Sequence, residues 1–234
     1  MNLWAFRLKQ SRRVYLLTVA MLMVGVLLAF CGAALGATHN AFWQMEDPTQ
    51  LVDSSGNNNG TTTNITGVPG SVGNGYHFNG SSSLATVPSS NSLNPGSANI
   101  TLTLDAKFTQ PPSTTVGDYD LVRKGLSSTS GGEYKMEILP RKNNTRAKAF
   151  CLFMDSSKTV GKIVNGPNLA DGRWHTLSCT KSSDSVQLRV DGTTYTNQVH
   201  LGSISNSAPL TIGAKTGGGD WYNGDMDSVS VDTF

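Results

Sequence analysis

Glu133 and Glu137 are the two side chains of this sequence whose type and spacing come closest to a catalytic pair. They lie in a segment expected to form a strand, where residues four apart point to the same face. Retaining glycoside hydrolysis needs two carboxyl groups about 5 Å apart whose pKa values differ. Lys135 lies midway between them and is expected to lower the pKa of both carboxyls, which removes the general acid. We therefore interpret the two glutamates as solvated surface charges and expect no catalytic activity.

Asp227 is a second residue with chemical potential. Val229 and Val231 share its parity, so strand geometry predicts that its carboxylate points toward the same face as two core valines. A carboxylate among apolar side chains is costly unless it is paired or bound to a metal. Lysine and arginine are scarce nearby, which favours an ion as its partner. An aspartate that caps or bonds a turn is the alternative.

Trp221 lies in a glycine-rich run, residues 217–224, and is the best candidate for an exposed aromatic side chain. A flat indole ring can stack on the apolar face of a sugar, and Asp220 and Asn223 are polar neighbours that would give direction to such a contact. Tyr222 fits a packing role. A Trp221 side chain that only closes one end of the fold is the alternative.

Other polar and aromatic residues are interpreted as structural. His175 is accompanied by no serine nucleophile motif or metal-binding histidine pair. The run at residues 53–60 lacks the alternating aspartates and terminal glutamate of an EF-hand loop, and Asx-turns with glycine account for it. The large apolar side chains of Trp43, Phe78 and Trp174 are expected in the core.

Cys151 and Cys179 are the two cysteines that follow the N-terminal leader, and each lies in an apolar, strand-like segment. An even pair in an oxidising compartment favours a disulfide. Two buried free thiols are the alternative. No CxxC motif or nearby histidine cluster accompanies them, so we expect no metal site here.

The leader, residues 1–37, has the pattern of a targeting segment. Four basic residues precede an almost wholly apolar run from Val14 to Phe30, and small residues follow up to Ala37. This order predicts a secretory signal peptide. The apolar helix is also long enough for a bilayer span, so an uncleaved membrane anchor is the alternative. We expect one domain over residues 38–234, secreted or membrane-anchored with the domain outside the cell.

The leader also explains the positive net charge. It holds four of the 18 lysines and arginines and none of the 16 acids, so the remainder carries 14 basic against 16 acidic residues. A basic surface for nucleic acid is therefore not expected. Contact with a membrane is expected only through an uncleaved N-terminal segment.

The elements that must position these residues are strands. Helical periodicity is absent after the leader, and clusters of Gly, Ser, Thr and Asn separate short apolar runs at intervals of roughly ten to fifteen residues, which is typical of a sandwich or barrel. Strict alternation at 100–108 predicts a sheet with one buried face. The expected strands are 41–45, 76–78, 84–87, 100–108, 121–123, 134–139, 186–190, 210–212 and 228–231, with 149–153 and 176–179 as further strand-like segments.

The order of several short motifs resembles the laminin-G-like family of concanavalin A-like jelly rolls. Each motif is weak alone, and their succession over residues 41–234 carries the resemblance. The motifs lie at 43–47, 53–60, 76–80, 87–88, 92–95, 121–125, 172–175, 191–192, 210–213 and 222–229. The resemblance implies an all-β fold of two antiparallel sheets in a jelly-roll sandwich.

The resemblance also implies binding without catalysis. It favours recognition of a glycan at the cell envelope or outside the cell, with an extracellular protein ligand as the alternative. Related hydrolases carry an aspartate where this chain has Lys135. Related jelly rolls hold a structural calcium between the first and last strands, and the matching residues here are Asp227, Glu46 and the backbone around Gly80, with Asp47 as a substitute for Glu46. Hard oxygen ligands of this kind suit Ca²⁺.

Overall fold

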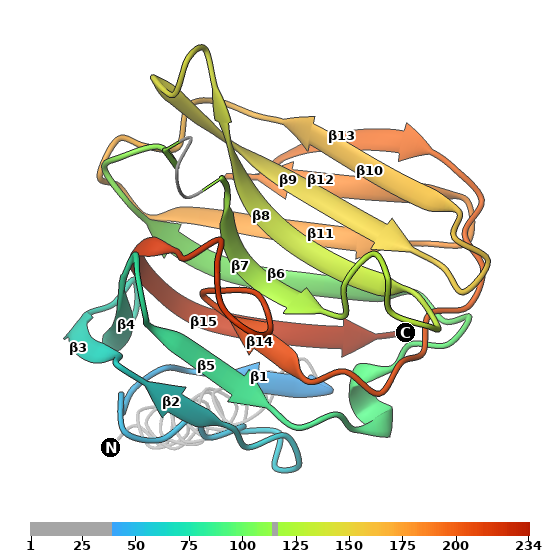
Figure 1. The fold of residues 1–234 in the computed structure, drawn as a ribbon, viewed down its shortest axis with the longest axis horizontal. Coiled ribbons are helices and arrows are strands. Elements are labelled where there is room, and N and C mark those ends of the chain that lie inside the picture. Colours follow the sequence, from blue (N-terminus) through green and yellow to red (C-terminus); the bar gives the residue numbers. More distant parts are fainter. Residues whose placement is uncertain (1–38, 114–116) are drawn as a thin grey trace, which may run out of the picture. The chain divides into compact units, whose positions relative to one another are not determined.

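Two antiparallel β-sheets face each other in this protein (Figure 1). The structure is a computed structural model and describes residues 39–113 and 117–234. The leader over residues 1–37, predicted as a signal or anchor helix, lies outside the described residues. Among the residues that are described, no helix has the length and apolar character needed to cross a membrane.

The first sheet has eight strands in the order β13-β12-β11-β6-β15-β4-β3, and β1 pairs with β15 beside this path. The longest strand of this sheet is β15, which pairs with β1, β4 and β6. The bounds are β1 (Ala41–Trp43), β3 (Thr66–Pro69), β4 (Asn74–Asn79), β6 (Ile100–Lys107), β11 (His175–Lys181), β12 (Ser185–Val190), β13 (Thr193–Gln198) and β15 (Asn223–Thr233).

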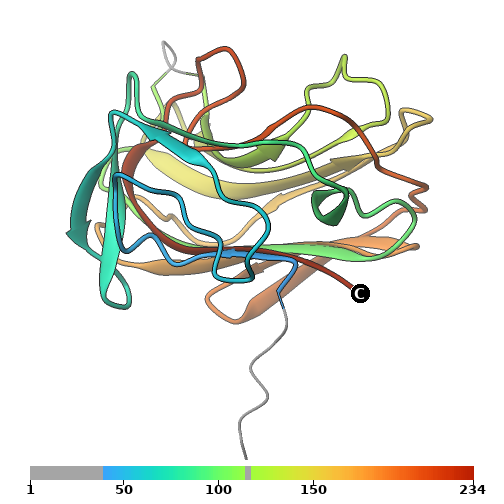
Figure 2. The same ribbon diagram turned by 90° about the horizontal axis from the view of Figure 1, so that it is seen from below.

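The second sheet has seven strands in the order β10-β9-β8-β7-β14-β5-β2. Figure 2 shows the two sheets as stacked layers. The bounds are β2 (Thr61–Thr63), β5 (Leu84–Val87), β7 (Tyr119–Lys124), β8 (Glu133–Arg141), β9 (Arg146–Met154), β10 (Val160–Asn165) and β14 (Leu210–Ile212), and one turn of 3₁₀ helix covers Asn91–Leu93. The predicted antiparallel jelly-roll sandwich is confirmed.

The core lies between the sheets because alternate residues of each strand point inward. In β6 every second side chain from Ile100 is fully buried and its neighbours are only partly buried. Trp43 and Phe78 are buried, as predicted. Trp174 is not a core residue, since it is only partly buried and the Lys107 ammonium lies 5.0 Å from its ring centroid. A tryptophan next to a strand end can lie on the rim and stack with a cation instead.

The four strands that the sequence did not predict are β2, β3, β10 and β13. They are the outermost strands of the two sheets, and most of their side chains are exposed or only partly buried. An edge strand with polar side chains on both faces shows little of the alternation on which the prediction depends. The buried strands were predicted because apolar and polar residues alternate along them, which indicates that one face packs on the core.

The predicted disulfide between Cys151 and Cys179 is confirmed, with Cα atoms 5.6 Å apart. Cys151 lies on β9 of the second sheet and Cys179 on β11 of the first. Both are fully buried. The bond therefore joins the two layers through the core rather than linking neighbours within one sheet.

His175 has a structural position at the start of β11. Its Nδ1 lies 2.7 Å from Asp191 Oδ2 and its Nε2 lies 3.0 Å from Asp171 Oδ1. The other oxygen of Asp191 accepts the N–H of Thr176 at 3.0 Å. The ring therefore ties the start of β11 to the turn that precedes it and to the turn between β12 and β13, which is a structural role.

Replacing both Cys151 and Cys179 with alanine is expected to lower the free energy of unfolding by about 3–4 kcal/mol, because the bond closes a loop with a sequence separation of 28 and restricts the unfolded chain. Denaturant titration of the protein with and without reductant measures this. Reductant should destabilise the wild-type chain and leave the double variant unchanged. Equal sensitivity of both chains to reductant would contradict the prediction.

The contribution of His175 to stability is expected to fall as pH rises. Burial alone would lower its pKa, but the hydrogen bonds to Asp191 and Asp171 outweigh burial, so the pKa of His175 is raised. The added stability is present below about pH 6.5, the ordinary histidine pKa, and is lost as pH rises through the higher folded-state pKa.

Urea titrations at several pH values compare wild type with His175→Gln. The difference in unfolding free energy should shrink from pH 5.5 to pH values above the folded-state pKa. His200→Gln is the matched control, because His200 also pairs with an aspartate but is 80% exposed. A difference for His175→Gln that does not depend on pH would show that the charge of the ring adds nothing.

Candidate functional site

The most unusual group of side chains lies on the outer face of the second sheet, on β7 and β8. Asp120 lies opposite Glu137, and Arg123 lies opposite Lys135. The register shifts between Asp120 and Val122. This β-bulge lets Asp120 and Arg123, three residues apart, point to the same face, which a regular strand does not allow.

Arg123 is the centre of this group and contacts three carboxylates. Its Nε donates to Asp120 Oδ2 at 2.9 Å, its Nη1 to Glu133 Oε2 at 3.3 Å and its Nη2 to Glu137 Oε1 at 2.5 Å. Lys135 also donates to Glu137 Oε1. The guanidinium thus spans the two glutamates that the sequence set apart as a pair.

The interpretation of Glu133 and Glu137 as solvated charges is wrong. Glu133 is 3% exposed and Glu137 is 1% exposed. Burial raises the pKa of Glu133, and this exceeds the lowering by Arg123 and Lys135. The sequence argument considered Lys135 alone, whereas burial on this face of the sheet has the larger effect on Glu133.

Asp118 completes the acidic side of the group. One carboxylate oxygen each of Asp118, Asp120 and Glu137 lie within 4.8 Å of one another. Burial, followed by repulsion from Glu137 and Asp220, raises the pKa of Asp118 to about 6. Burial also raises the pKa of Asp120, to about 8, against the opposing effect of Arg123. We define the charged cluster as Asp118, Asp120, Arg123, Glu133, Lys135 and Glu137.

The loop over residues 213–222, which carries the predicted ligand-binding residues Asp220 and Trp221, packs against the start of β7. The N–H of Asp120 donates to the carbonyl of Asp220 at 2.9 Å. The carboxylate of Asp220 pairs with Lys215 at 3.0 Å within the loop. Trp221 is partly buried. The structure therefore brings Asp220 next to the charged cluster.

Tyr222 and Asn223 end this loop and have different roles. Tyr222 is fully buried and packs against Phe78 and Tyr119, with ring centroids 5.7 and 5.6 Å away. This matches the packing role predicted for it. Asn223 is exposed and opposes Asn79 at the start of β15. Asp220 and Trp221 thus lie on the loop, whereas Asn223 lies on the strand that follows it.

Asp227 does not point to the core, which corrects the parity argument. It lies opposite Asp105 in the register, and the pairing shifts between Asp227 and Ser230. Ser71 Oγ donates to Asp105 Oδ2 at 2.5 Å and to Asp227 Oδ2 at 3.0 Å. A second bulge therefore separates Asp227 from the core valines. Its side chain is nevertheless fully buried.

The residues of the predicted calcium set are only partly brought together. Asp227 Oδ2 accepts the N–H of Val72 at 2.9 Å, and Glu46 Oε2 accepts the N–H of Asn74 at 3.0 Å. Both carboxylates thus bond the turn between β3 and β4. Gly80 donates instead to Tyr222 O, five residues before Asp227, or about 16 Å along an extended strand. A calcium ion on Asp227 and Glu46 stays a prediction, with Gly80 outside that pair.

The run at residues 53–60 is a turn, as predicted. Asp53 Oδ1 accepts the backbone N–H groups of Phe42 and Ser55, each at 2.9 Å, and Oδ2 accepts that of Asn58 at 2.9 Å. Burial opposes these hydrogen bonds, but together they lower the pKa of Asp53 to about 2. The carboxylate of Asp53 thus accepts backbone hydrogen bonds that hold the turn.

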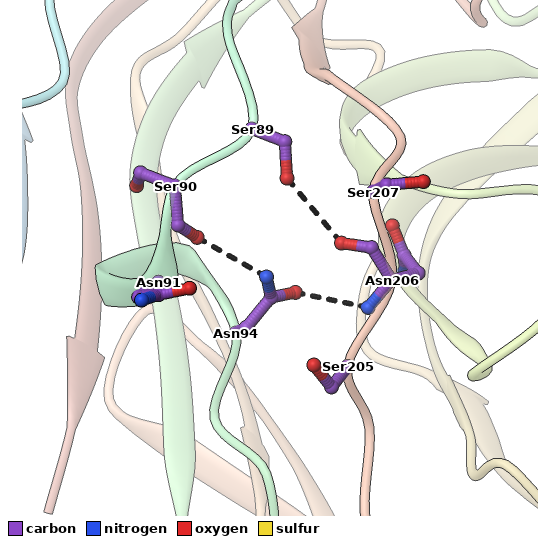
Figure 3. Close-up of a pocket in the computed structure, with 7 residues that line it drawn as sticks. All are labelled: Ser89, Ser90, Asn91, Asn94, Ser205, Asn206 and Ser207. Atoms are coloured by element: carbon purple, nitrogen blue, oxygen red, sulfur yellow. Dashed lines mark hydrogen bonds between the residues drawn. The ribbon is translucent and has the colours of Figure 1, made fainter.

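A polar hollow of about 380 Å³ lies beside the 3₁₀ turn, where segment 89–94 meets segment 205–207. In Figure 3 hydrogen bonds join the two segments: Asn206 N donates to Asn94 Oδ1 at 3.1 Å and Ser89 Oγ to Asn206 O at 3.3 Å. Lys124 Nζ also donates to Asn206 O, at 2.7 Å. The lining residues are Ser89, Ser90, Asn91, Asn94, Ser205, Asn206 and Ser207.

The sequence argument missed Asp118, Asp120 and Arg123 as members of a site. Asp118 and Asp120 precede a predicted strand, and Arg123 was placed only as part of that strand. The available signal was charge density, since three charged residues lie within the six positions 118–123. These three side chains come together only because of the β-bulge, and no residue pattern in this segment predicts a bulge.

The fold and its details can be compared with known proteins. The structure of the binding domain of Paraclostridial Mosquitocidal Protein 1 matches with a TM-score of 0.63 at 15% identity, over 84% of this chain and 48% of that one. The botulinum neurotoxin serotype D binding domain matches with a TM-score of 0.61 at 13% identity, over 84% and 47%. This chain thus spans about half the length of these toxin domains.

A third similar structure is domain 4 of AbnA, a GH43 extracellular arabinanase from Geobacillus stearothermophilus, in complex with arabinotriose. It has a TM-score of 0.59 at 15% identity, and the match covers 84% of this chain and 94% of that domain. At these identities the likeness concerns the fold. A search of the curated proteins finds no match.

The sequence itself matches a family over residues 78–232, which is about two thirds of the chain. The matched region runs from β4 to the end of β15 and includes both bulges, the disulfide and the charged cluster. Together with the two-sheet topology, this match shows that the chain belongs to the concanavalin A-like lectin/glucanases superfamily.

Proposed function

We propose that this protein is a non-catalytic binding module that recognises a glycan at the cell envelope or outside the cell. It is secreted, or held at the membrane by an uncleaved N-terminal segment. The disulfide supports an oxidising compartment. Two of the similar structures are binding domains, and a third is a domain of an extracellular arabinanase in complex with arabinotriose.

The observation that carries the glycan proposal is the position of Trp221. The indole is partly buried in a loop that contains three consecutive glycines, 217–219. A Cβ atom on Gly218 would lie 3.0 Å from Trp221 Cζ2, so the loop backbone packs closely against the indole. A side chain held in this way loses little entropy when it stacks on a sugar ring. Lys215 and Asp220 supply charged groups in the same loop.

The absence of catalysis is supported by the state of the glutamates. Arg123 donates to both Glu133 and Glu137, and Lys135 donates to Glu137 as well. A nucleophile that is committed to a guanidinium and an ammonium is a poor one, and both glutamates are almost fully buried. A substrate would have to displace these ion pairs to reach them.

An extracellular protein ligand is the second candidate. Two similar structures are receptor-binding domains of botulinum neurotoxins, of mosaic serotype C/D and of type G, each at 10% identity. Such a ligand would use a broad surface and would depend less on one indole. Substitution of Trp221 therefore separates the two candidates.

Trp221→Ala is expected to lower glycan affinity about 5- to 150-fold, the loss of an aromatic stacking contact worth about 1–3 kcal/mol. A glycan array on the wild-type protein identifies the ligand, and calorimetry with that ligand measures the loss. Trp174→Ala is the matched control, because Trp174 is also partly buried but lies beneath Lys107, before β11. Equal losses in both variants, or none in Trp221→Ala, would contradict a site at this loop.

A finer test compares two glycines in the loop. Gly217 and Gly218 both have positive φ, at 85° and 93°, so alanine strains both positions. Only a Cβ on Gly218 would press on Trp221, since Gly217 has open space. Gly218→Ala is therefore expected to weaken glycan binding more than Gly217→Ala. Glycan affinity and thermal unfolding of both variants separate the effect on the indole from the effect on the loop.

The protein is expected to release no reducing sugar from polysaccharides. A reducing-end assay over a panel of β-glucans, arabinans and galactans checks this, with Glu133→Gln as the partner variant. Sugar release by the wild-type chain that disappears in Glu133→Gln would overturn the non-catalytic proposal and show that the buried glutamates act as a catalytic pair.

A further inference from the structure

The charged cluster contains more acid than base, and three of its four carboxylates are buried, whereas Asp118 is partly buried. The cluster holds four carboxylates, Asp118, Asp120, Glu133 and Glu137, and two cations, Arg123 and Lys135, so full ionisation gives it two net negative charges. Lys158, outside the cluster, adds attraction to Glu133. Asp220 adds repulsion to Asp118, although Lys215 pairs with Asp220. Uncompensated charge with little access to water is unstable unless a further cation or proton joins it.

The cations that are present occupy only some of the oxygens. Arg123 Nε bonds Asp120 Oδ2, and Arg123 Nη2 and Lys135 Nζ share Glu137 Oε1. Among the described residues, Asp120 Oδ1 and Asp118 Oδ1 are buried and have no hydrogen-bond partner. The Asp120 side chain is 1% exposed, so water does not supply the missing partner freely. Buried polar atoms in native proteins are rarely left in this state.

We propose that Asp118, Asp120 and Glu137 bind one divalent cation, Ca²⁺, on the outer face of the second sheet. Each residue offers an oxygen, and the three oxygens lie within 4.8 Å of one another. Oxygens that share one calcium ion at about 2.3–2.6 Å are at most about 5.2 Å apart. The existing geometry can therefore hold the ion without moving a strand.

Calcium fits this donor set better than the alternatives. The three donors are carboxylates, without the thiolate or imidazole that zinc prefers. Magnesium requires near-ideal octahedral geometry at about 2.0–2.1 Å, whereas calcium accepts irregular sets of carboxylates and waters. The ion would also cancel the two excess charges of the cluster.

The ion would connect β7 to β8, and through β7 to the loop that carries Trp221. Asp118 directly precedes β7, Asp120 lies at the start of β7, and Glu137 belongs to β8. The backbone N–H of Asp120 holds the carbonyl of Asp220, next to Trp221. An ion that fixes Asp120 would therefore also steady the base of the loop that carries the indole.

The competing arrangement is a proton shared by Asp120 and Glu137. It would relieve part of the negative charge and use one unpartnered oxygen without a metal. It predicts no calcium binding at this position. The experiment must therefore detect the ion directly and must also separate this site from the predicted calcium pair of Asp227 and Glu46.

Calorimetric titration of the full-length protein with Ca²⁺ after chelation should show binding, with a dissociation constant up to about 10⁻³ M, the range of extracellular calcium modules. Thermal unfolding should shift upward with added Ca²⁺ and not with equal ionic strength of Na⁺. Asp118→Asn and Asp120→Asn should each weaken this binding at least tenfold. Asp118→Asn is the safer variant, because Asp118 has no ion pair with Arg123.

Asp227→Asn and Glu46→Gln are the matched controls, and both should keep the part of the calcium heat that Asp118→Asn and Asp120→Asn remove, whether or not a second ion binds at Asp227 and Glu46. Loss of the heat in these two variants, with retention in Asp118→Asn and Asp120→Asn, would assign calcium to the other pair and overturn the proposal. Absence of heat and of a thermal shift in the wild type up to 10 mM Ca²⁺ would overturn it in favour of the shared proton. Glycan binding is measured separately, so neither result depends on the glycan proposal.

Discussion

The packing of one sheet face against the other is the constraint on which the rest of this structure depends. Each strand must give alternate side chains to the layer between the sheets, and the disulfide between Cys151 and Cys179 crosses that same layer. Because the apolar residues are used there, the charged residues of the inner strands are directed to the outer faces or to the ends of the sandwich. The position of every candidate site follows from this division.

Two β-bulges break the alternation, and each changes where a carboxylate lies. One lies between Asp120 and Val122 and the other between Asp227 and Ser230. The first puts Asp120 on the same face as Arg123, and the second turns Asp227 away from the core valines. An extra residue in one strand reverses the parity of everything beyond it. The two bulges thus place the carboxylates of Asp120 and Asp227 beside other polar side chains on the outer faces of the sheets.

The sequence predicted the parts of the molecule that alternation controls. Leu84–Val87 and Leu210–Ile212 were predicted with their observed bounds, and the disulfide followed from two cysteines in apolar segments. The edge strands were missed because they bury little. Parity placed Asp227 wrongly, and the argument that Lys135 lowers the pKa of Glu133 failed because it did not include burial. Arg123 contacts carboxylates on the neighbouring strand, and no pattern in the sequence around Arg123 predicts these contacts.

The charged cluster buries several carboxylates that must keep their cationic partners, and this restricts the conformation of β7 and β8. Arg123 cannot be removed without leaving several buried carboxylates unpaired, so the cluster is conformationally restrictive even where it adds little net stability. It lies under the base of a loop whose glycines give the backbone freedom, and the Asp120–Asp220 hydrogen bond joins the restricted part to the free part. A binding loop gains affinity when its base is fixed, because less entropy is lost on contact with a ligand. The charge state of β7 and the order of the Trp221 loop are therefore physically linked through the backbone hydrogen bond of Asp120, beside which Gly213 donates to the carbonyl of Leu121.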